Sequence, residues 1–260
     1  MKSASGTSLD RRRLLTALLL FAAPALALAE TGPAARTLTA DIPAAGLKEL
    51  DLRVGVGEVH VSPSPDDQVH VEIKLRQKDE EFLWFFHWSS SGSAKDIAEA
   101  AIYQRRDGDT LSLGLDHDDR NDSVKQEWKL ELPARLALDA DMKVGDLVIA
   151  GVAGGVDAVL NVGELDIDVP QGRIKANVSV GDIRAKSGSG AYGRVRVTSN
   201  IGDAVLTING EHSGFHGHSG LGNEVSVDGK GPDDMDLSVN VGEATLRIGA
   251  AADTKQEGGK

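Results

Sequence analysis

The stretch Val144–Ile149 reads Val-Gly-Asp-Leu-Val-Ile: an apolar residue, a glycine and an acid, followed by apolar residues. Its later copies are Val162-Gly163-Glu164, Val180-Gly181-Asp182, Ile201-Gly202-Asp203, Leu221-Gly222-Asn223 and Val241-Gly242-Glu243. From Gly145 the glycines step by 18, 18, 21, 20 and 20 residues. Such regular spacing indicates an internal structural repeat. An early copy, Val56-Gly57-Glu58, lies outside this phased series.

Each period contains two stretches in which apolar and polar residues alternate, which is typical of strands with one buried face. In one period the residues predicted to face inward are Leu165, Ile167, Val169, Ile174, Ala176, Val178 and Val180. Two strands and two turns in such a period make one coil of a β-solenoid, whose successive coils pair in parallel. The predicted fold is all-β, a single-chain β-solenoid with coils of 18 to 21 residues and irregular N-terminal strands.

The composition fits a narrow interior built of aliphatic side chains. The 260 residues are 40% hydrophobic but only 4% aromatic, and they include 30 glycines and no cysteine. Glycine suits tight corners, because it has no Cβ. The repeat glycines, to which we assign a structural role, are Gly57, Gly145, Gly163, Gly181, Gly202, Gly222 and Gly242. A chain without cysteine forms no disulfides, thiol nucleophiles or cysteine metal sites.

Residues 1–29 are typical of an export signal. The basic cluster Arg11–Arg13 precedes the apolar run Leu14–Leu28, and Ala27 and Ala29 fit a cleavage site before Glu30. The arginines and leucines also match a twin-arginine signal loosely, so both export routes stay open. Removal of this segment changes the net charge from −12 to −15, since it holds four basic residues and one acid. We expect a periplasmic or secreted protein that does not bind nucleic acid, because phosphates require clustered cations.

Four regions are predicted: the signal (1–29), an N-terminal β region (30–140) with an aromatic insert (79–101), the regular repeats (141–248) and a disordered tail (249–260). Strands are expected in the N-terminal region at 48–54, 56–61, 68–77, 100–106, 110–116 and 126–132. Asp107-Gly108 is typical of a hairpin turn. These strands form either irregular first coils or a separate sheet that caps the solenoid.

The early strand phrase Leu52–Val61, the stretch Leu130-Glu131-Leu132-Pro133 and the repeated apolar-Gly-acid phrase resemble the bacterial putative-adhesin domains of unknown function. The resemblance covers roughly residues 40–248. It implies an exported β-solenoid, with no catalytic residues and no fixed ligand.

Several clusters are candidates for binding. The acid after each repeat glycine forms a row that either binds Ca²⁺ or keeps the surface soluble. Asp116–Asp122 resembles an EF-hand loop only in part and is better interpreted as a hairpin loop. The last cluster consists of three histidines that are candidate ligands for a transition metal: His212, His216 and His218. We predict that none of these binds a metal, and that the protein has no cofactor.

The aromatic insert is the candidate for partner binding. Its residues are Phe82, Trp84, Phe85, Phe86 and Trp88, five of the nine aromatic residues that remain after signal removal. They either plug the solenoid's end, together with a short helix at Ala94–Ala101, or form an exposed contact site.

We predict no enzymatic activity, because nucleophile elbows, phosphate loops and metalloprotease motifs are missing from the sequence. The predicted function is a non-catalytic, adhesin-like scaffold or interaction surface in the bacterial cell envelope, with an unidentified protein, glycan or membrane partner. One alternative is a periplasmic module that binds a partner or a membrane through residues 82–88. A second is a carbohydrate-active β-solenoid enzyme.

Overall fold

The computed structural model describes residues 35–76, 94–116, 124–188, 190–212 and 222–249, all within one compact unit, Pro33–Lys260. The N-terminal elements are β1 (Ala35–Pro43), β2 (Glu49–Pro63), β3 (Gln68–Arg76), the short helix α1 (Ala94–Glu99), β4 (Ile102–Asp107), β5 (Thr110–Leu115) and β6 (Lys125–Leu132). The repeat region contributes β7 (Ala137–Ala150), β8 (Val156–Val169), β9 (Ile174–Ser187), β10 (Tyr192–Ile201), β11 (Ala204–Ile208), β12 (Glu211–His212), β13 (Asn223–Asp228), β14 (Asp233–Val241) and β15 (Ala244–Ile248). The predicted all-β class is confirmed.

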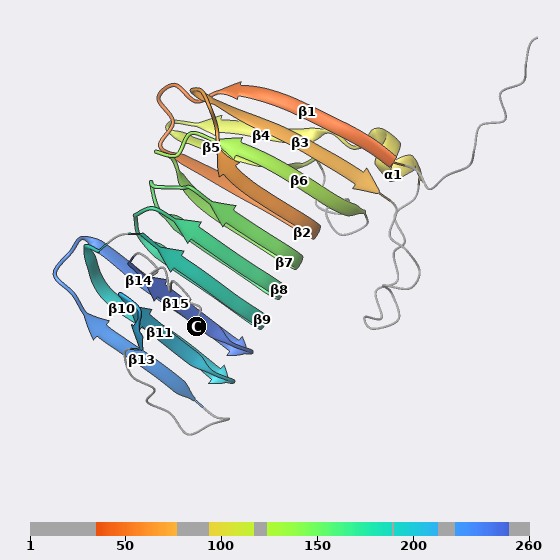
Figure 1. Cartoon of the computed structure of the whole chain (residues 1–260). Coiled ribbons are helices and arrows are strands. Elements are labelled where there is room, and N and C mark those ends of the chain that lie inside the picture. The colour runs from red at the N-terminus through yellow and green to blue at the C-terminus, as the bar shows by residue number, and fades with distance from the viewer. Residues whose placement is uncertain (1–34, 77–93, 117–123, 189, 213–221, 250–260) are drawn as a thin grey trace, which may run out of the picture. The chain divides into compact units, whose positions relative to one another are not determined.

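The described strands form one open, mixed, 15-stranded sheet. Figure 1 shows β2, β7, β8 and β9 stacked as successive rungs. These rungs pair in parallel, and their glycines are in register: Gly57 with Gly145, Gly145 with Gly163, and Gly163 with Gly181. The early copy of the phrase therefore belongs to the same series as the later ones.

The order of the last rungs differs from the order of the sequence. The sixth copy, on β14 and β15, lies between β9 and the fourth copy, on β10 and β11. The prediction that successive coils are neighbours is thus wrong beyond β9. The glycine spacing could not reveal this, because the third, fourth and sixth copies carry nearly the same apolar-Gly-acid phrase and fit one another in any order.

The fifth copy also departs from the parallel pattern. Its strand β13 pairs antiparallel with β10, with Val225 opposite Val197 and Asn223 opposite Ser199. Its apolar residues are shifted by one position from the repeat, and in a parallel strand a one-residue shift would turn them to the other face. The reversed strand instead keeps Val225 buried. At the start of this copy Gly222 has a φ of +69°.

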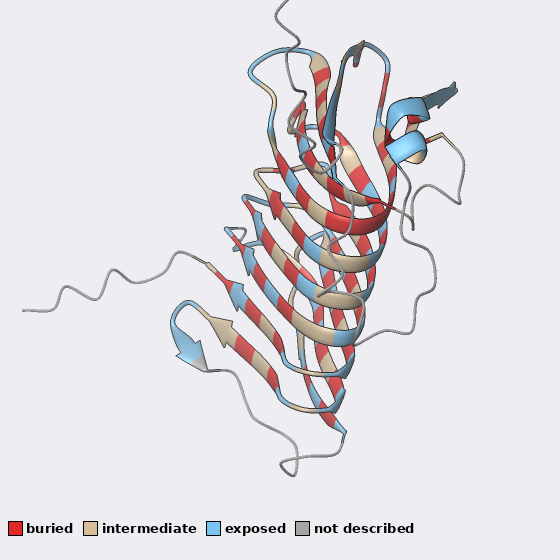
Figure 2. Cartoon of the chain, turned by 90° about the vertical axis from the view of Figure 1, so that its right-hand side faces the viewer, coloured by how far each residue is buried: buried red, intermediate tan, exposed pale blue. Residues whose placement is uncertain are grey.

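The long strands bend in the middle, and buried and exposed residues alternate along both halves (Figure 2). Leu165, Ile167 and Val169 are buried on β8, and Ile174, Ala176 and Val178 on β9, as predicted. The prediction that Val180 faces inward is wrong, because this residue is 47% exposed. The alternation breaks at the bend, where Asn161–Glu164 on β8 all lie away from the core.

The N-terminal strands belong to this same sheet, so they are not a separate cap sheet. Strands β5 and β6 pair in parallel with the two halves of β2, which runs unbroken through Gly57 where two strands were predicted. The hairpin at Asp107-Gly108 is confirmed, since Asp107 on β4 pairs with Thr110 on β5. The edge strand β1 was not predicted.

A buried aromatic residue lies near the N-terminal end of the stack. Trp128 on β6 is only 1% exposed, and its indole Nε1 donates to Oε1 of the buried Gln126 at 2.8 Å. Leucine, isoleucine and methionine side chains make up the rest of the largest fully buried residues in the described part of the chain. The described interior therefore accommodates the large ring of Trp128, whose N–H has an acceptor.

Candidate functional site: an exposed ladder at the strand bend

The bend of each rung is built around a glycine in the left-handed region. Gly145, Gly163 and Gly181 have φ values of +129°, +140° and +133°. A Cβ on Gly163 would lie less than 3.0 Å from the carbonyl oxygen of Gly145, and the same relation joins Gly181 to Gly163. Gly242 would meet Gly181, and Gly202 would meet Gly242. Glycine thus lets the backbones of neighbouring rungs approach closely at the bend.

On β7, β8, β9, β14 and β10 the residue before the glycine points outward, whereas Val56 on β2 is buried, and these outward residues form a ladder of β-branched side chains. We name this set the apolar ladder; its members, paired in register, are Val144, Val162, Val180, Val241 and Ile201. Val180, Val241 and Ile201 are 47%, 38% and 50% exposed. Scattered exposed aliphatic residues are normal on a protein surface, and the contiguity of this row makes it a candidate contact site.

The acids after the glycines form a second row beside the apolar ladder. We name it the acidic ladder, and its spatial order is Glu58, Asp146, Glu164, Asp182, Glu243 and Asp203. The Glu243 backbone N–H donates to Asp182 at 2.9 Å, which joins the third and sixth copies. Asn223 lies beyond the last acid, and its side-chain amide donates to the carbonyl of Gly202.

Two cations neutralise part of the acidic ladder. Arg184 bridges Glu164 at 2.8 Å and Asp182 at 3.3 Å, and the hydrogen bond with Glu164 raises the pKa of Arg184. Lys125 pairs with Glu58 at 3.0 Å and lowers the pKa of that carboxyl. The acidic ladder has four carboxylates beside the exposed half of the apolar ladder, Glu164, Asp182, Glu243 and Asp203, and among the described residues Arg184 pairs with the first two of them. The surface there carries net negative charge.

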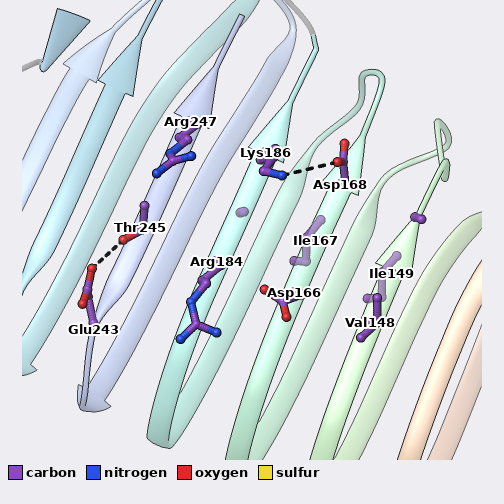
Figure 3. Close-up of a pocket in the computed structure, with 12 residues that line it drawn as sticks. Val148, Ile149, Asp166, Ile167, Asp168, Arg184, Lys186, Glu243, Thr245 and Arg247 are labelled. Carbon is purple, nitrogen blue, oxygen red and sulfur yellow. Dashed lines mark hydrogen bonds and ion pairs between the residues drawn. The ribbon is translucent and has the colours of Figure 1, made fainter. Parts of the chain in front are cut away.

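A groove of about 450 Å³ adjoins the acidic ladder on the second halves of β7, β8, β9 and β15. Figure 3 shows Asp166, Asp168, Arg184, Lys186 and Arg247 along it. Lys186 on β9 pairs in register with the like-charged Arg247 on β15, but opposite charges are neighbours on β8 and β9, for example Lys186 and Asp168 at 3.8 Å. Such pairs between exposed groups hold the rungs in register weakly. The charges therefore balance one another across the strands rather than converge on one point.

Several predicted site residues lie outside the described part of the chain. These are the aromatic residues Phe82, Trp84, Phe85, Phe86 and Trp88, together with His216, His218 and the loop 117–122. The export signal and residues 250–260 also lie outside it. Within the described ranges, no group of three or more His, Asp or Glu side chains is placed to hold a metal ion. The alternatives for the aromatic insert stay open.

The apolar ladder is the feature that sequence reasoning missed. Its signal was present, because a valine or isoleucine precedes the glycine in every copy that forms a rung. However, Asn161, Asn240 and Asn200 directly precede Val162, Val241 and Ile201. A strictly alternating strand that buried the valine or isoleucine would also have a polar residue at this preceding position. A straight strand with the valine buried and a bent strand with the valine exposed therefore have the same sequence pattern, and only the bend seen in the structure distinguishes them.

No helix among the described residues is long and apolar enough to cross a membrane. The fold defines an all-β protein made of stacked rungs. No family model and no curated protein matches the sequence. Among solved structures, a putative cell adhesion protein from Clostridium sporogenes is similar, with 14% identity and a TM-score of 0.51 over 82% of this chain and 99% of that one.

Two further structures are putative adhesins from Bacteroides fragilis and Parabacteroides distasonis. They are 13% and 11% identical, and each covers 82% of this chain and 97% of its own. Their TM-scores are 0.31 and 0.23, well below that of the clostridial protein. The chain shares its fold with the clostridial protein, and its resemblance to the putative-adhesin domains is confirmed at the level of fold.

Proposed function

We propose that this chain is a non-catalytic, adhesin-like contact protein, exported to the bacterial cell envelope, whose stacked rungs serve as a solenoid scaffold. The observation that carries the proposal is the apolar ladder, because three half-exposed β-branched residues, Val180, Val241 and Ile201, lie on adjacent rungs. The partner is an envelope component that covers this row.

The scaffold suits this role because each rung repeats the same outward residues. The pairing of Val162 with Val180, and of Glu164 with Asp182, gives a surface that continues from strand to strand. Such repetition creates an extended contact surface rather than an enclosed pocket. The name of the clostridial protein, which shares the fold, agrees with a role in adhesion. The export signal at residues 1–29 supplies the route to the envelope.

Co-sedimentation with separated outer membrane, inner membrane and peptidoglycan tests the proposal. The ladder variant is Val180→Ser/Val241→Ser/Ile201→Ser, and we expect the wild-type protein to pellet with one fraction and this variant to stay in solution. The control variant Tyr103→Ser/Val159→Ser removes two other exposed apolar residues, which are 42% and 36% exposed. It should pellet like the wild type, and melting curves check that all variants are folded.

Two results would contradict this assignment. If the ladder variant pellets as well as the wild type, the apolar ladder is not the contact site. If a Trp84→Ser/Trp88→Ser variant alone loses binding, the aromatic insert makes the contact, as the alternative prediction holds.

A further inference from the structure

The apolar and acidic ladders together specify the chemistry of a partner. On the exposed rungs, the apolar row of Val162, Val180, Val241 and Ile201 runs beside the carboxylates Glu164, Asp182, Glu243 and Asp203. The other side of the row is neutral, since Asn200 there donates to Asn240 at 2.9 Å. A matching surface has an apolar centre and cations along one side only.

Arg184 neutralises only part of the acidic ladder on these rungs, so the surface still favours a cationic partner. It contacts Glu164 and Asp182, on the two middle rungs. Glu243 accepts from the hydroxyl of Thr245 at 2.8 Å, and Asp203 from the amide of Asn223 at 3.4 Å, both neutral donors. Neutral donors do not offset the charge of a carboxylate, so Glu243 and Asp203 can attract Lys or Arg from a partner.

The spacing of the rungs favours a helical partner. Paired strands lie about 4.8 Å apart, so four rungs span about 14 Å. An α-helix laid along the row repeats its apolar face about every 5.4 Å, and three turns depart from the rungs by only about 2 Å. In an extended strand, residues on one face repeat about every 6.7 Å, so after three repeats the strand is out of step with the rungs by about 6 Å. Side chains can absorb the first mismatch but not the second.

We propose that the two ladders bind an amphipathic α-helix of a partner protein, with its apolar stripe on Val162, Val180, Val241 and Ile201 and Lys or Arg residues along one flank. This inference rests on the proposed function, because it names the partner class for the same surface. It differs from a general attraction between an acidic protein and basic peptides, since it requires both the helical period and the apolar row.

The probe is a synthetic 18-residue peptide of Leu and Lys with helical periodicity, titrated into the purified protein and followed by calorimetry. We expect the ladder variant Val180→Ser/Val241→Ser/Ile201→Ser to bind it about tenfold more weakly, through lost apolar burial. The acidic-ladder variant Asp182→Asn/Glu243→Gln/Asp203→Asn should weaken binding to a similar degree, about tenfold at low salt and less at high salt. Circular dichroism of the complex should show the peptide as a helix.

Matched controls separate this site from non-specific attraction. Tyr103→Ser/Val159→Ser removes exposed apolar residues elsewhere, and Glu49→Gln/Asp139→Asn/Asp141→Asn removes three acids from the outer face of β2 and β7. Both should bind the peptide like the wild type. A peptide of the same composition with alternating Leu and Lys should bind at least about tenfold less tightly.

The inference fails if the alternating peptide binds equally well, or if the two control variants lose as much affinity as the ladder variants. Failure here is distinguishable from failure of the proposed function. If the ladder variant loses envelope binding but not peptide binding, the result supports the apolar ladder as the envelope contact and contradicts the helical partner. If it loses peptide binding but keeps envelope binding, the surface is not the envelope contact.

Discussion

Replacing Gly163 with alanine is expected to destabilise the protein by about 3 kcal/mol or more. Two effects add. Gly163 has a φ of +140°, a backbone conformation that residues with a Cβ rarely adopt. The new methyl group would also overlap the carbonyl oxygen of Gly145 on the neighbouring rung. Since that neighbour is backbone, no side chain can rotate away. Thermal unfolding followed by circular dichroism should show Tm about 6–12 °C lower.

The control for this variant is Gly108→Ala. Gly108 also has a positive φ, +63°, but a Cβ there would meet nothing within 4 Å. Its cost should be the conformational term alone, about 1 kcal/mol. Equal losses in the two variants would show that the close approach of the rungs at the bend contributes nothing to stability.

Replacing Trp128 with alanine should cost about 3–5 kcal/mol. The ring is 1% exposed and fills the interior at β6, and its N–H donates to Gln126 at 2.8 Å. Alanine leaves a cavity that the surrounding strands can fill only in part. Urea denaturation followed by far-ultraviolet circular dichroism measures the loss.

Two companion variants assign this cost. Trp128→Phe keeps most of the packing and leaves the oxygen of Gln126 without the indole donor, so it should lose about 1–2 kcal/mol. Tyr103→Ala, at a residue that is 42% exposed, should change stability by less than about 0.5 kcal/mol. A loss at Trp128 no larger than that at Tyr103 would contradict the buried position of the indole.

The repeat phrase predicted the strands and their parallel register well, because period-2 alternation and a glycine at fixed spacing constrain one rung and its contact with the next. The phrase did not predict which rung follows which. The third, fourth and sixth copies offer the same shape to a neighbour, so the sequence position of β14 gave no indication that it lies between β9 and β10.

The candidate site could be predicted only in part. The acidic row followed directly from the phrase, although the position of Glu243 between Asp182 and Asp203 required the strand order. Val180 of the apolar ladder was assigned to the core, because it continues the alternation of Ile174, Ala176 and Val178. The strand bends at the next residue, Gly181, and breaks that alternation; the repeat glycine marks the bend but does not specify which way the residue before it points.

Disulfide trapping tests the strand order on which the ladders depend. The chain has no cysteine, so pairs introduced at exposed ladder positions are the only thiols. Val180 and Ile201 each pair in register with Val241, within reach of a disulfide, whereas Val180 and Ile201 lie two strands apart, about 10 Å. Val180→Cys/Val241→Cys and Val241→Cys/Ile201→Cys should therefore oxidise readily under mild conditions, and Val180→Cys/Ile201→Cys should not. Rapid oxidation of this last pair, with none in the first two, would place the fourth copy directly beside the third and contradict the ladder.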